Sequence, residues 1–324
     1  MLLMRLGFVA RSLAHPELRS HDGRRWQNGP HLSVSLAYLR DTLLYVARSH
    51  IGMYRMSSEL APYVTHPDMP QFHRQVAECQ RELAAVGQLA RSCEIRLSFH
   101  AGQHVVLNSP DPTVAAHSAA DVLSQAEILD AMDLGPEAVI VTHLGGLYDD
   151  AVGARARFIS CFLTLPEPVR RRLAIENDDS RYGVVDTVWV HQETGLRVVF
   201  DALHHRLHCP DGSDPLVALA QCLATWPVGV RPKIHYSTPR TEMTITRTPG
   251  STAPQVHRPQ WRNHADYVNP FEFIDFLRLA GSQPSFDVML EVKARDLALL
   301  QLRDDLVSFA PDLAACEERP AANL

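Results

Sequence analysis

The amino-acid sequence predicts an α/β protein built as a single (β/α)₈ TIM barrel, with a metal site at the C-terminal ends of its strands. Short, almost continuously apolar runs alternate with longer amphipathic segments eight times along the chain, as in a parallel sheet covered on both faces. Eight such units close a (β/α)₈ barrel. Six of the runs also end in histidine, aspartate or glutamate, at the strand ends where active sites of this fold lie.

Composition agrees with one ordinary globular domain. The chain has 324 residues, of which 46% are hydrophobic and 21% are charged. We expect residues 1–310 to form the barrel and residues 311–324 to form a loosely ordered tail. The formal net charge of -6 provides no basic field over the whole protein, so a nucleic-acid partner requires a local basic patch.

Cysteine usage and hydropathy indicate where the protein works. None of the six cysteines belongs to a C-x-x-C pair, which favours a reducing compartment. The apolar start at residues 1–4 is too short for a signal peptide, and no apolar run approaches the ~20 residues that span a bilayer. We therefore expect a cytoplasmic protein without a membrane partner.

The predicted strands are short apolar runs bounded by polar, glycine or proline residues. The run at 96–100 shows the pattern most clearly, because it stops at His100 and is followed by a small residue and a glycine. In chain order, the predicted strands occupy residues 5–10, 53–57, 96–100, 138–142, 173–176, 197–201, 233–235 and 288–291.

The segments between the strands have apolar residues at helical spacing. Residues 11–29 and the insert at 238–262 lack this spacing, so we expect loops there. Helix ends coincide with helix breakers, as at Gly135-Pro136 and Gly195. The predicted helices are 32–48, 72–91, 116–132, 151–163, 184–194, 215–225, 271–279 and 296–309.

The strand ends carry the residue types that bind metals. A mixture of imidazoles and carboxylates suits Mn²⁺, Fe or Zn²⁺, whereas an all-oxygen set suits Mg²⁺ or Ca²⁺. Three carboxylates at one barrel mouth repel one another unless cations neutralise them, so we expect a cluster of two or three ions. A lone strand-end histidine is more often structural, but the agreement of six strand ends reverses those odds. The six residues are His100, His143, Glu176, Asp201, His235 and Glu291.

Four further residues are candidates for this cluster. His204 follows Asp201 by three residues, and His66 and His264 lie on loops. Lys233 precedes His235 by two residues, so both side chains face the same side of their strand. The alternative for Lys233 is a lysine that snorkels at the barrel mouth.

Longer motifs give the chain a resemblance to a known family. They run in family order over nearly the whole chain, from about residue 5 to 302, and are jointly specific. The chain resembles the ultraviolet damage endonucleases, which are (β/α)₈ metalloenzymes that nick DNA beside photolesions. The motifs are YRMSSEL at 54–60 with His66-Pro67, RLSFHAGQ at 96–103 with VLNSP at 106–110, HLGG at 143–146, ENDD at 176–179, FDALHH at 200–205, KIHYS at 233–237, HADY at 264–267 and the stretch 287–300.

The resemblance implies a site and a reaction. Lys233 matches a lysine that the family carries in carboxylated form, and we expect Lys233, Glu176 and His235 to be catalytic. The implied cofactor is Mn²⁺ and the implied substrate is damaged double-stranded DNA. The implied cut lies immediately 5′ of the lesion and leaves a 3′-hydroxyl and a 5′-phosphate. We expect a monomer with no obligate protein partner. The implied metal-site residues are His66, His100, His143, Glu176, Asp201, His204, His235, His264 and Glu291.

The departures from the family pattern concern the substrate. The family wedges a glutamine and an aromatic residue into the duplex, whereas this chain has Gln103 followed by His104. Imidazole still stacks, though with less area than tyrosine. Phe8 stands where the family has a tyrosine, and Ser12 where it has an asparagine. We expect these four residues to contact DNA or the lesion.

The insert at 238–262 is longer than the resemblance predicts. Its arginines are candidates for phosphate contacts, and a solvated polar loop is an equal alternative. They are Arg240, Arg247, Arg258 and Arg262.

Three hypotheses follow. The first is a Mn²⁺-dependent DNA repair endonuclease for UV photolesions and other helix-distorting lesions. The second is a metalloenzyme on the same scaffold that acts on a small molecule, which the altered wedge and the acidic net charge favour. The third is a lesion sensor that binds DNA without cutting it. It is the weakest, because a protein that does not cut has no need of every metal-site residue.

Overall fold

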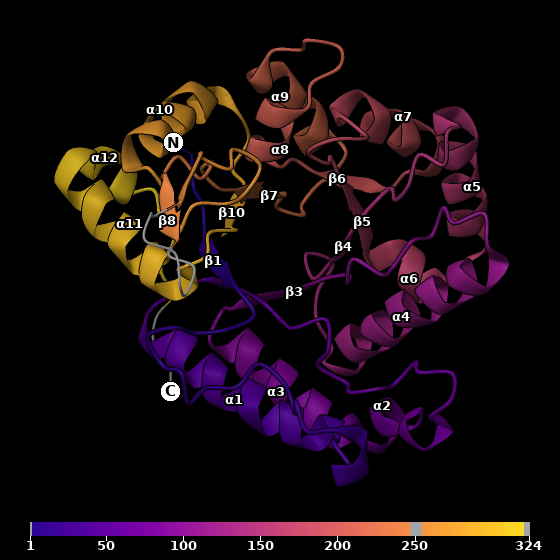
Figure 1. The fold of residues 1–324 in the computed structure, drawn as a ribbon. Helices are drawn as coiled ribbons and strands as arrows, with labels where there is room; N and C mark the ends of the chain where they lie inside the picture. The colour runs from indigo at the N-terminus through magenta and orange to yellow at the C-terminus, as the bar shows by residue number, and fades with distance from the viewer. Residues whose placement is uncertain (1, 247–254, 321–324) are drawn as a thin grey trace.

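Eight parallel strands form the barrel that the sequence predicts, in a computed structural model that describes residues 2–246 and 255–320 (Figure 1). The strands are hydrogen-bonded in the order β6-β5-β4-β3-β2-β1-β10-β7. A parallel backbone bridge between Asp201 and His235 connects β6 to β7 and closes the ring. The strands are β1 (Leu6–Val9), β2 (Met53–Arg55), β3 (Arg96–His100), β4 (Ile140–His143), β5 (Leu173–Glu176), β6 (Arg197–Val199), β7 (Lys233–Tyr236) and β10 (Asp287–Leu290).

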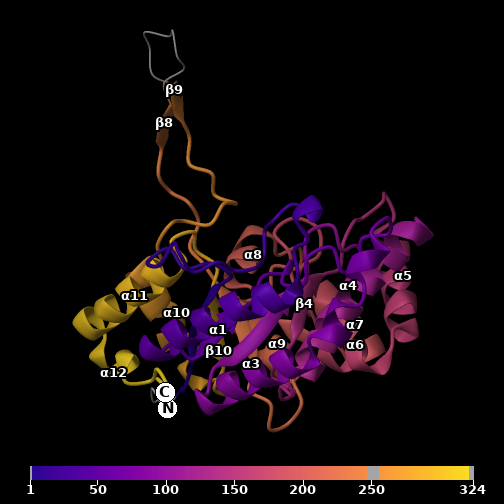
Figure 2. The ribbon, with the colours of Figure 1, turned by 90° about the horizontal axis from the view of Figure 1, so that it is seen from below.

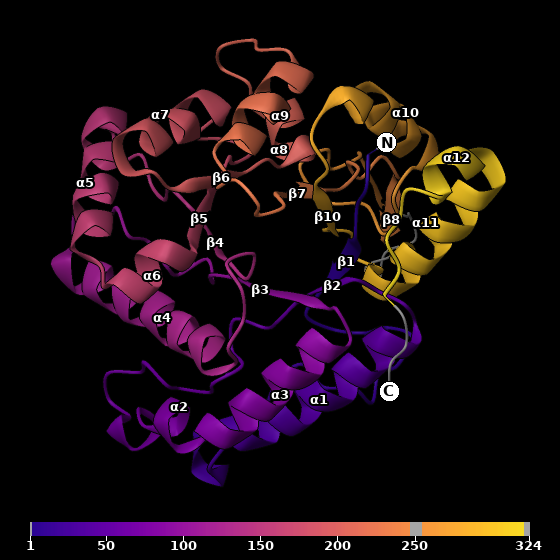
Figure 3. The ribbon, with the colours of Figure 1, turned by 180° about the vertical axis from the view of Figure 1, so that it is seen from behind.

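Helices surround the sheet, as opposite views in Figures 1 and 3 show. None of the described helices is long and apolar enough to cross a membrane. The helices longer than four residues are α1 (Leu32–Arg48), α3 (Gln80–Ser92), α4 (Pro112–Ala131), α5 (Ala151–Thr164), α6 (Glu167–Arg172), α7 (Val184–Thr194), α8 (Ala202–Leu207), α9 (Pro215–Ala224), α10 (Pro270–Leu279) and α11 (Arg295–Phe309).

Alternation along the strands separates a polar barrel interior from an apolar outer layer. On β3, Leu97 and Phe99 are buried in the main hydrophobic core. Ser98, which lies between them, faces the interior, because successive side chains of a strand point to opposite faces. Ser98 meets Lys233 of β7 there, at 3.2 Å. Deeper in the barrel, the fully buried Arg96 pairs with Asp287 of β10 at 2.8 Å. The metal-ligand residues form the top layer of this interior.

Several helical segments differ from the prediction. The expected helix 72–91 is divided into η2 (Pro70–Phe72), α2 (Gln75–Glu78) and α3, and the backbone leaves the helical region at Cys79. α4 begins earlier than expected, because Asp111 caps it by accepting a hydrogen bond from the backbone N–H of Thr113. The sequence analysis missed α6 and α8, since six residues are too few to display a helical period.

The C-terminal segment is more ordered than the sequence predicts. Residues 311–320 were expected to belong to a loose tail, but α12 (Pro311–Ala314) forms within them and Cys316 is buried. The backbone N–H of Met4 donates to the carbonyl of Cys316 at 3.1 Å, and that of Glu318 donates to the carbonyl of Met4 at 2.8 Å. The segment therefore pairs with the chain just before β1.

The insert between β7 and α10 contains a hairpin instead of an irregular loop. Its strands β8 (Thr244–Thr246) and β9 (Gln255–His257) pair antiparallel and stand away from the barrel (Figure 2). The sequence analysis did not find them, because three-residue strands give little alternation. Of the four arginines noted in the insert, Arg247 lies outside the described residues.

Candidate metal centre

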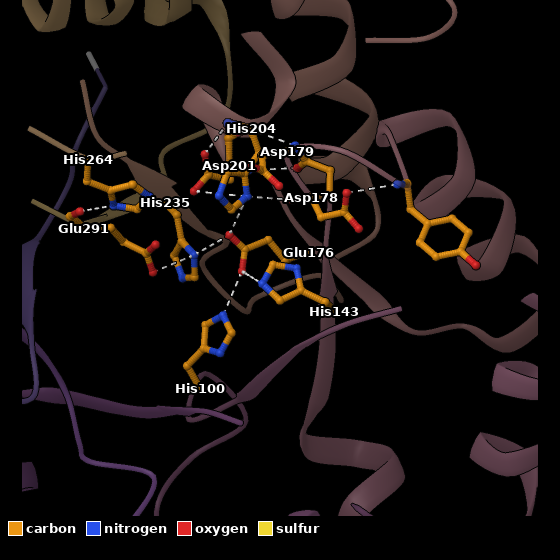
Figure 4. A network of polar contacts seen from close by, with 12 residues as sticks. His100, His143, Glu176, Asp178, Asp179, Asp201, His204, His235, His264 and Glu291 are labelled. Atoms are coloured by element: carbon orange, nitrogen blue, oxygen red, sulfur yellow. Dashed lines mark hydrogen bonds and ion pairs between the residues drawn. The ribbon is translucent and has the colours of Figure 1, made fainter. Parts of the chain in front are cut away.

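The strand ends converge on one cluster at the mouth of the barrel (Figure 4). Ligand atoms fall into three groups, and within each group all atoms lie within 4.8 Å of one another. The sequence pattern therefore identified residues from six separate strands that meet in space. The groups are His100, His143 and Glu176; His100, His235 and Glu291; and Glu176, Asp201, His235 and Glu291.

Glu176 lies at the centre of the cluster and is fully buried. Its two carboxylate oxygens contact His100 Nε2 at 3.0 Å and His235 Nδ1 at 2.9 Å. His143 Nε2 lies 4.0 Å from the same carboxylate. Burial by itself raises the pKa of Glu176, but the imidazole of His235 and its neighbours outweigh burial and hold the pKa well below its ordinary value. Glu176 is thus an anion shared among imidazoles.

Asp201 has the opposite balance. Burial raises the pKa of its carboxyl group well above the ordinary value, although His204 opposes that rise, and the charges of Glu176 and Glu291 raise it further. A bound cation would relieve this repulsion and keep Asp201 ionised. For His204, burial opposes protonation, but Asp201 and the other carboxylates outweigh it and raise the pKa of the imidazole to about 9.

Three buried ligand atoms of the cluster have no hydrogen-bond partner in the structure. They are Asp201 Oδ2, His143 Nδ1 and His235 Nε2. Buried polar atoms normally find a partner, so an unpaired atom requires an explanation. A divalent cation supplies one, because it accepts lone pairs from imidazole nitrogen and carboxylate oxygen together. Burial also lowers the pKa of His235 and of His143, which favours the neutral imidazole that binds metals.

Two residues that the sequence analysis gave no role hold the ligands in place. Asn177 donates its side-chain N–H to the carbonyl of Asp201 at 3.1 Å and accepts the backbone N–H of Asp201 at 2.9 Å. Its own carbonyl lies 2.9 Å from His204 Nδ1. Arg55 forms an ion pair with Glu291. In the sequence, only the position of Arg55 in the motif YRMSSEL and of Asn177 in the motif ENDD pointed to a role at this site.

Lys233 lies below the cluster and does not reach solvent. Its Nζ donates to Ser98 Oγ at 3.2 Å inside the barrel. Burial lowers the pKa of this amine well below its ordinary value, and the charges of Arg96 and Arg55 lower it further. The alternative of a snorkelling lysine is therefore wrong, since the amine is buried in the polar interior.

The two loop histidines lie in different places. The ring of His264 contacts the carbonyl of Glu291 and lies 6.2 Å from the ring of His204, so it lies beside the cluster. Like His204, it is in none of the three groups of ligand atoms found among the described residues. His66 lines a neighbouring cavity, where its Nδ1 accepts the backbone N–H of Asp68 at 3.2 Å. Among the described residues, no group of ligand atoms within 4.8 Å includes His66.

A cavity of about 1100 Å³ opens above the cluster. Its walls include three carboxylates, Asp178, Asp179 and Glu291, and a larger number of cationic side chains. Two of the cationic side chains pair with these carboxylates, Arg55 with Glu291 and Arg262 with Asp179, so the excess of positive charge at the cavity wall is small. The cationic residues are Arg55, Arg181, Arg262, Lys293 and Arg295.

The four residues expected to contact DNA are divided by the structure. Gln103 is exposed and lines the main cavity. His104 is exposed and lines the neighbouring cavity, where its Nε2 lies 2.8 Å from Asp121. The two side chains of the expected wedge thus border different cavities.

The expectation for Phe8 and Ser12 requires correction. Phe8 is fully buried in the outer core, with its ring edge-on to that of Tyr54 at 5.3 Å, because it shares the outward face of β1 with Leu6. Ser12 is 1% exposed, and its hydroxyl donates to Asp296. Neither residue lines the cavity above the cluster, so neither is placed to contact a substrate there.

Comparisons with known proteins identify the family of the chain. A family model described as UV-endonuclease UvdE matches residues 32–317. The UV DNA damage endonuclease of Bacillus velezensis is 33% identical over 280 residues, which are 85% of this chain and 82% of that protein. The protein of the same name from Bacillus pumilus is also 33% identical over 280 residues, with the same coverage.

Solved structures give the same result. The crystal structure of SacUVDE matches with a TM-score of 0.77 and 28% identity, covering 94% of this chain and 98% of that one. D-psicose 3-epimerase from Clostridium cellulolyticum H10 matches with a TM-score of 0.54 at 12% identity, which shows a shared fold alone. With most of its length matched by the family model and by these relatives, the chain belongs to the UV-endonuclease UvdE family.

Proposed function

We propose that this protein is a metal-dependent DNA repair endonuclease. It nicks damaged double-stranded DNA immediately 5′ of UV photolesions and other helix-distorting lesions, leaving a 3′-hydroxyl and a 5′-phosphate. The observation that carries the proposal is the cluster of imidazoles and carboxylates, with its unpaired ligand atoms, at the base of a cavity rich in cationic side chains. Membership of the UvdE family supports the reaction class.

The donor set fits two or three Mn²⁺ ions. Mixed nitrogen and oxygen ligands suit Mn²⁺, and the three groups of ligand atoms share residues, as in a multinuclear site. When bound, such ions activate water and neutralise charge on the phosphate. The residues that would hold the ions are His100, His143, Glu176, Asp201, His204, His235, His264 and Glu291.

Residues of the chain orient the ligands and the substrate. Asn177 and Arg55 fix Asp201 and Glu291 by hydrogen bonds and an ion pair. Cationic residues at the cavity wall, such as Arg181 and Lys293, are placed to bind the phosphates that flank the cut. Gln103 borders the same cavity, and its proposed role is to probe the distorted duplex.

Lys233 is proposed to be carboxylated, as in the related family. A lysine held as a neutral amine has a free electron pair, which attacks CO₂ and releases one proton to give a carbamate anion. The low pKa of this amine favours the reactive form, since burial and the nearby Arg96 and Arg55 disfavour the ammonium ion. The carbamate carries a negative charge that suits a position below several cations.

The rival hypotheses receive less support. The comparisons add only a shared fold to the case for a small-molecule enzyme, because the epimerase structures are related at 11–13% identity. A cavity of about 1100 Å³ with five cationic side chains suits a polyanion better than a neutral sugar. A DNA sensor does not explain a complete set of metal ligands.

One experiment tests these alternatives. The purified protein is incubated with Mn²⁺ and an end-labelled duplex that contains a single photolesion, and the products are resolved at single-nucleotide resolution. We expect a lesion-dependent nick immediately 5′ of the lesion, removed by EDTA and restored by Mn²⁺. Binding without a nick favours the sensor. Stoichiometric metal without binding or a nick favours the small-molecule enzyme.

A further inference from the structure

The hairpin formed by β8 and β9 is the feature of the molecule that the proposed active site leaves unexplained. Figure 2 shows it extending beyond the helices as a narrow arm, which we define as the described residues 241–246 and 255–261. The strands pair antiparallel in the register Thr244↔His257, Ile245↔Val256 and Thr246↔Gln255. On the strands, Thr246 Oγ1 and His257 Nε2 lie 2.8 Å apart.

One face of the arm is apolar and exposed. Ile245 and Val256 lie directly opposite each other, so their side chains share a face, and they are 65% and 60% exposed. Met243 precedes Ile245 by two residues and is 68% exposed. A two-stranded ribbon has no second layer against which to bury such side chains and is only marginally stable alone. The face is therefore available to a partner outside the barrel.

The base of the arm is continuous with the cavity above the metal cluster. A backbone bridge joins Pro239 to His264, and the N–H of Arg240 donates to the carbonyl of Asn263 at 2.7 Å. Arg262 contacts the carbonyl and the carboxylate of Asp179 and lines the cavity together with Asn263. A duplex whose scissile phosphate enters the cavity has to pass beside this base.

The charge of the arm suits DNA. The described residues of the arm and its base carry three arginines, Arg240, Arg258 and Arg262, against one acidic residue, Glu242. Arg240 lies 3.9 Å from Glu242 and Arg262 pairs with Asp179, which leaves Arg258 without an acidic partner among the described residues. Arg258 follows Val256 by two residues, lies just beyond the end of β9, and is exposed. The whole chain has a net charge of -6, so this excess of cations is local. Local cations beside a phosphate-binding cavity favour a polyanionic partner over a second copy of an acidic protein.

We propose that the arm binds the duplex beside the lesion, with its apolar face in the major groove and Arg258 on a phosphate. The B-DNA major groove, about 12 Å wide, admits a two-stranded β-ribbon. Apolar side chains there contact thymine methyl groups and the walls of the groove. This inference rests on the proposed function for its substrate, and adds a second contact region outside the catalytic cavity.

Two cross-strand pairs of the arm provide a matched test. Ile245→Ser with Val256→Ser alters the apolar face, and Thr246→Ala with Gln255→Ala alters the pair on the opposite face. Arg258→Ala is the third variant. Binding is measured by fluorescence anisotropy on lesion-containing and undamaged duplexes of about 30 base pairs, roughly 100 Å long, over a range of salt concentrations. Two further measurements are made on each variant: the nicking rate at saturating DNA, and the molar mass of the free protein by light scattering.

We expect the apolar-pair variant to bind both duplexes about tenfold more weakly, a loss on the scale of one or two buried methylene groups. The opposite-face variant stays within about twofold of the unmodified protein. Arg258→Ala lowers the slope of log K against log salt by about one, as for one lost phosphate contact. The nicking rate at saturating DNA stays unchanged in all three.

Three outcomes overturn the inference. The first is unchanged affinity and salt slope in both the apolar-pair and Arg258 variants while the unmodified protein nicks normally, which leaves the proposed function intact. The second is an unmodified protein that binds no duplex. The third is a protein that is dimeric in solution and becomes monomeric only in the apolar-pair variant, with DNA affinity unchanged. That result would assign the apolar face of the arm to contact with a second copy of the chain. Loss of duplex binding in the arm variants without any nicking by the unmodified protein supports the arm and refutes the endonuclease.

Discussion

Asn177 offers the sharpest test of how the metal centre is assembled. The residue is fully buried, and its amide makes two hydrogen bonds to the backbone of Asp201, at 2.9 and 3.1 Å. Asn177→Ala removes both bonds. The backbone N–H of Asp201 is then left unpaired in the protein interior, whereas the carbonyl of Asp201 still accepts the backbone N–H of His205 at 3.1 Å. The substitution leaves the Asn177 carbonyl, which lies beside His204, in the chain.

The expected magnitude follows from these contacts. A buried polar group left unpaired costs about 1–3 kcal/mol, so the loss of the partner of the Asp201 N–H lowers the free energy of unfolding of the metal-free protein by about that amount. Residues that orient a metal ligand from outside typically contribute 10–100-fold to metal affinity. We therefore expect the Mn²⁺ concentration for half-maximal nicking to rise by about 10–100-fold, with the rate largely restored at saturating Mn²⁺.

Asn108 provides a matched control elsewhere in the chain. It is also fully buried, and its side-chain amide likewise makes two hydrogen bonds to the backbone of one residue, Gly146. The amide donates to the carbonyl of Gly146 at 2.7 Å and accepts the N–H of Gly146 at 3.1 Å. Asn108→Ala should cost similar stability while shifting the Mn²⁺ requirement by no more than about twofold. Urea unfolding and Mn²⁺ titration of nicking, performed on both variants, give the comparison. Equal Mn²⁺ requirements for Asn177→Ala and the unmodified protein would refute the role of Asn177 in positioning Asp201.

Other predictions concern the ligands, the lower barrel and lesion contact. Glu176→Gln or Asp201→Asn should abolish nicking with the circular-dichroism spectrum retained, and full activity in either variant would refute the metal mechanism. Burial raises the pKa of Asp287, but Arg96 and Arg5 outweigh it and lower the pKa. The stability from this charge is therefore present above the unfolded pKa of about 4 and is lost as the pH falls below it. Asp287→Asn should lower the free energy of unfolding by about 3–5 kcal/mol at pH 7, because Arg96 loses its buried partner. The free energy of unfolding, measured with urea, should also fall less steeply at acid pH in this variant than in the unmodified protein. An equally steep fall would count against the Arg96–Asp287 pair. His104→Tyr should strengthen binding to a lesion duplex if this position stacks on DNA, and equal affinity by anisotropy would remove His104 from lesion contact.

The sequence alone determined the barrel and most of the residues that form the candidate metal centre. Parallel strands buried on both faces appear as apolar runs, and the fold places every strand's C-terminal end on one side. A residue at the C-terminal end of one apolar run therefore lies at the same mouth of the barrel as the residues that end the other runs, whatever their separation in the sequence. His100, His143, Glu176, His235 and Glu291 were found on this basis, and they meet in the structure.

Only the tertiary structure decided which way individual side chains face and what they contact. Phe8 occupies a strand like the ligands do, but it falls on the outward face of β1, and its burial depends on packing against Tyr54. Asn177 and Arg55 are placed by contacts with distant segments, which leave no period in the sequence. The arm became visible only through the pairing of two three-residue strands. Periodicity reports which face of an element is buried, whereas the partner across the barrel depends on how the closed sheet aligns its strands.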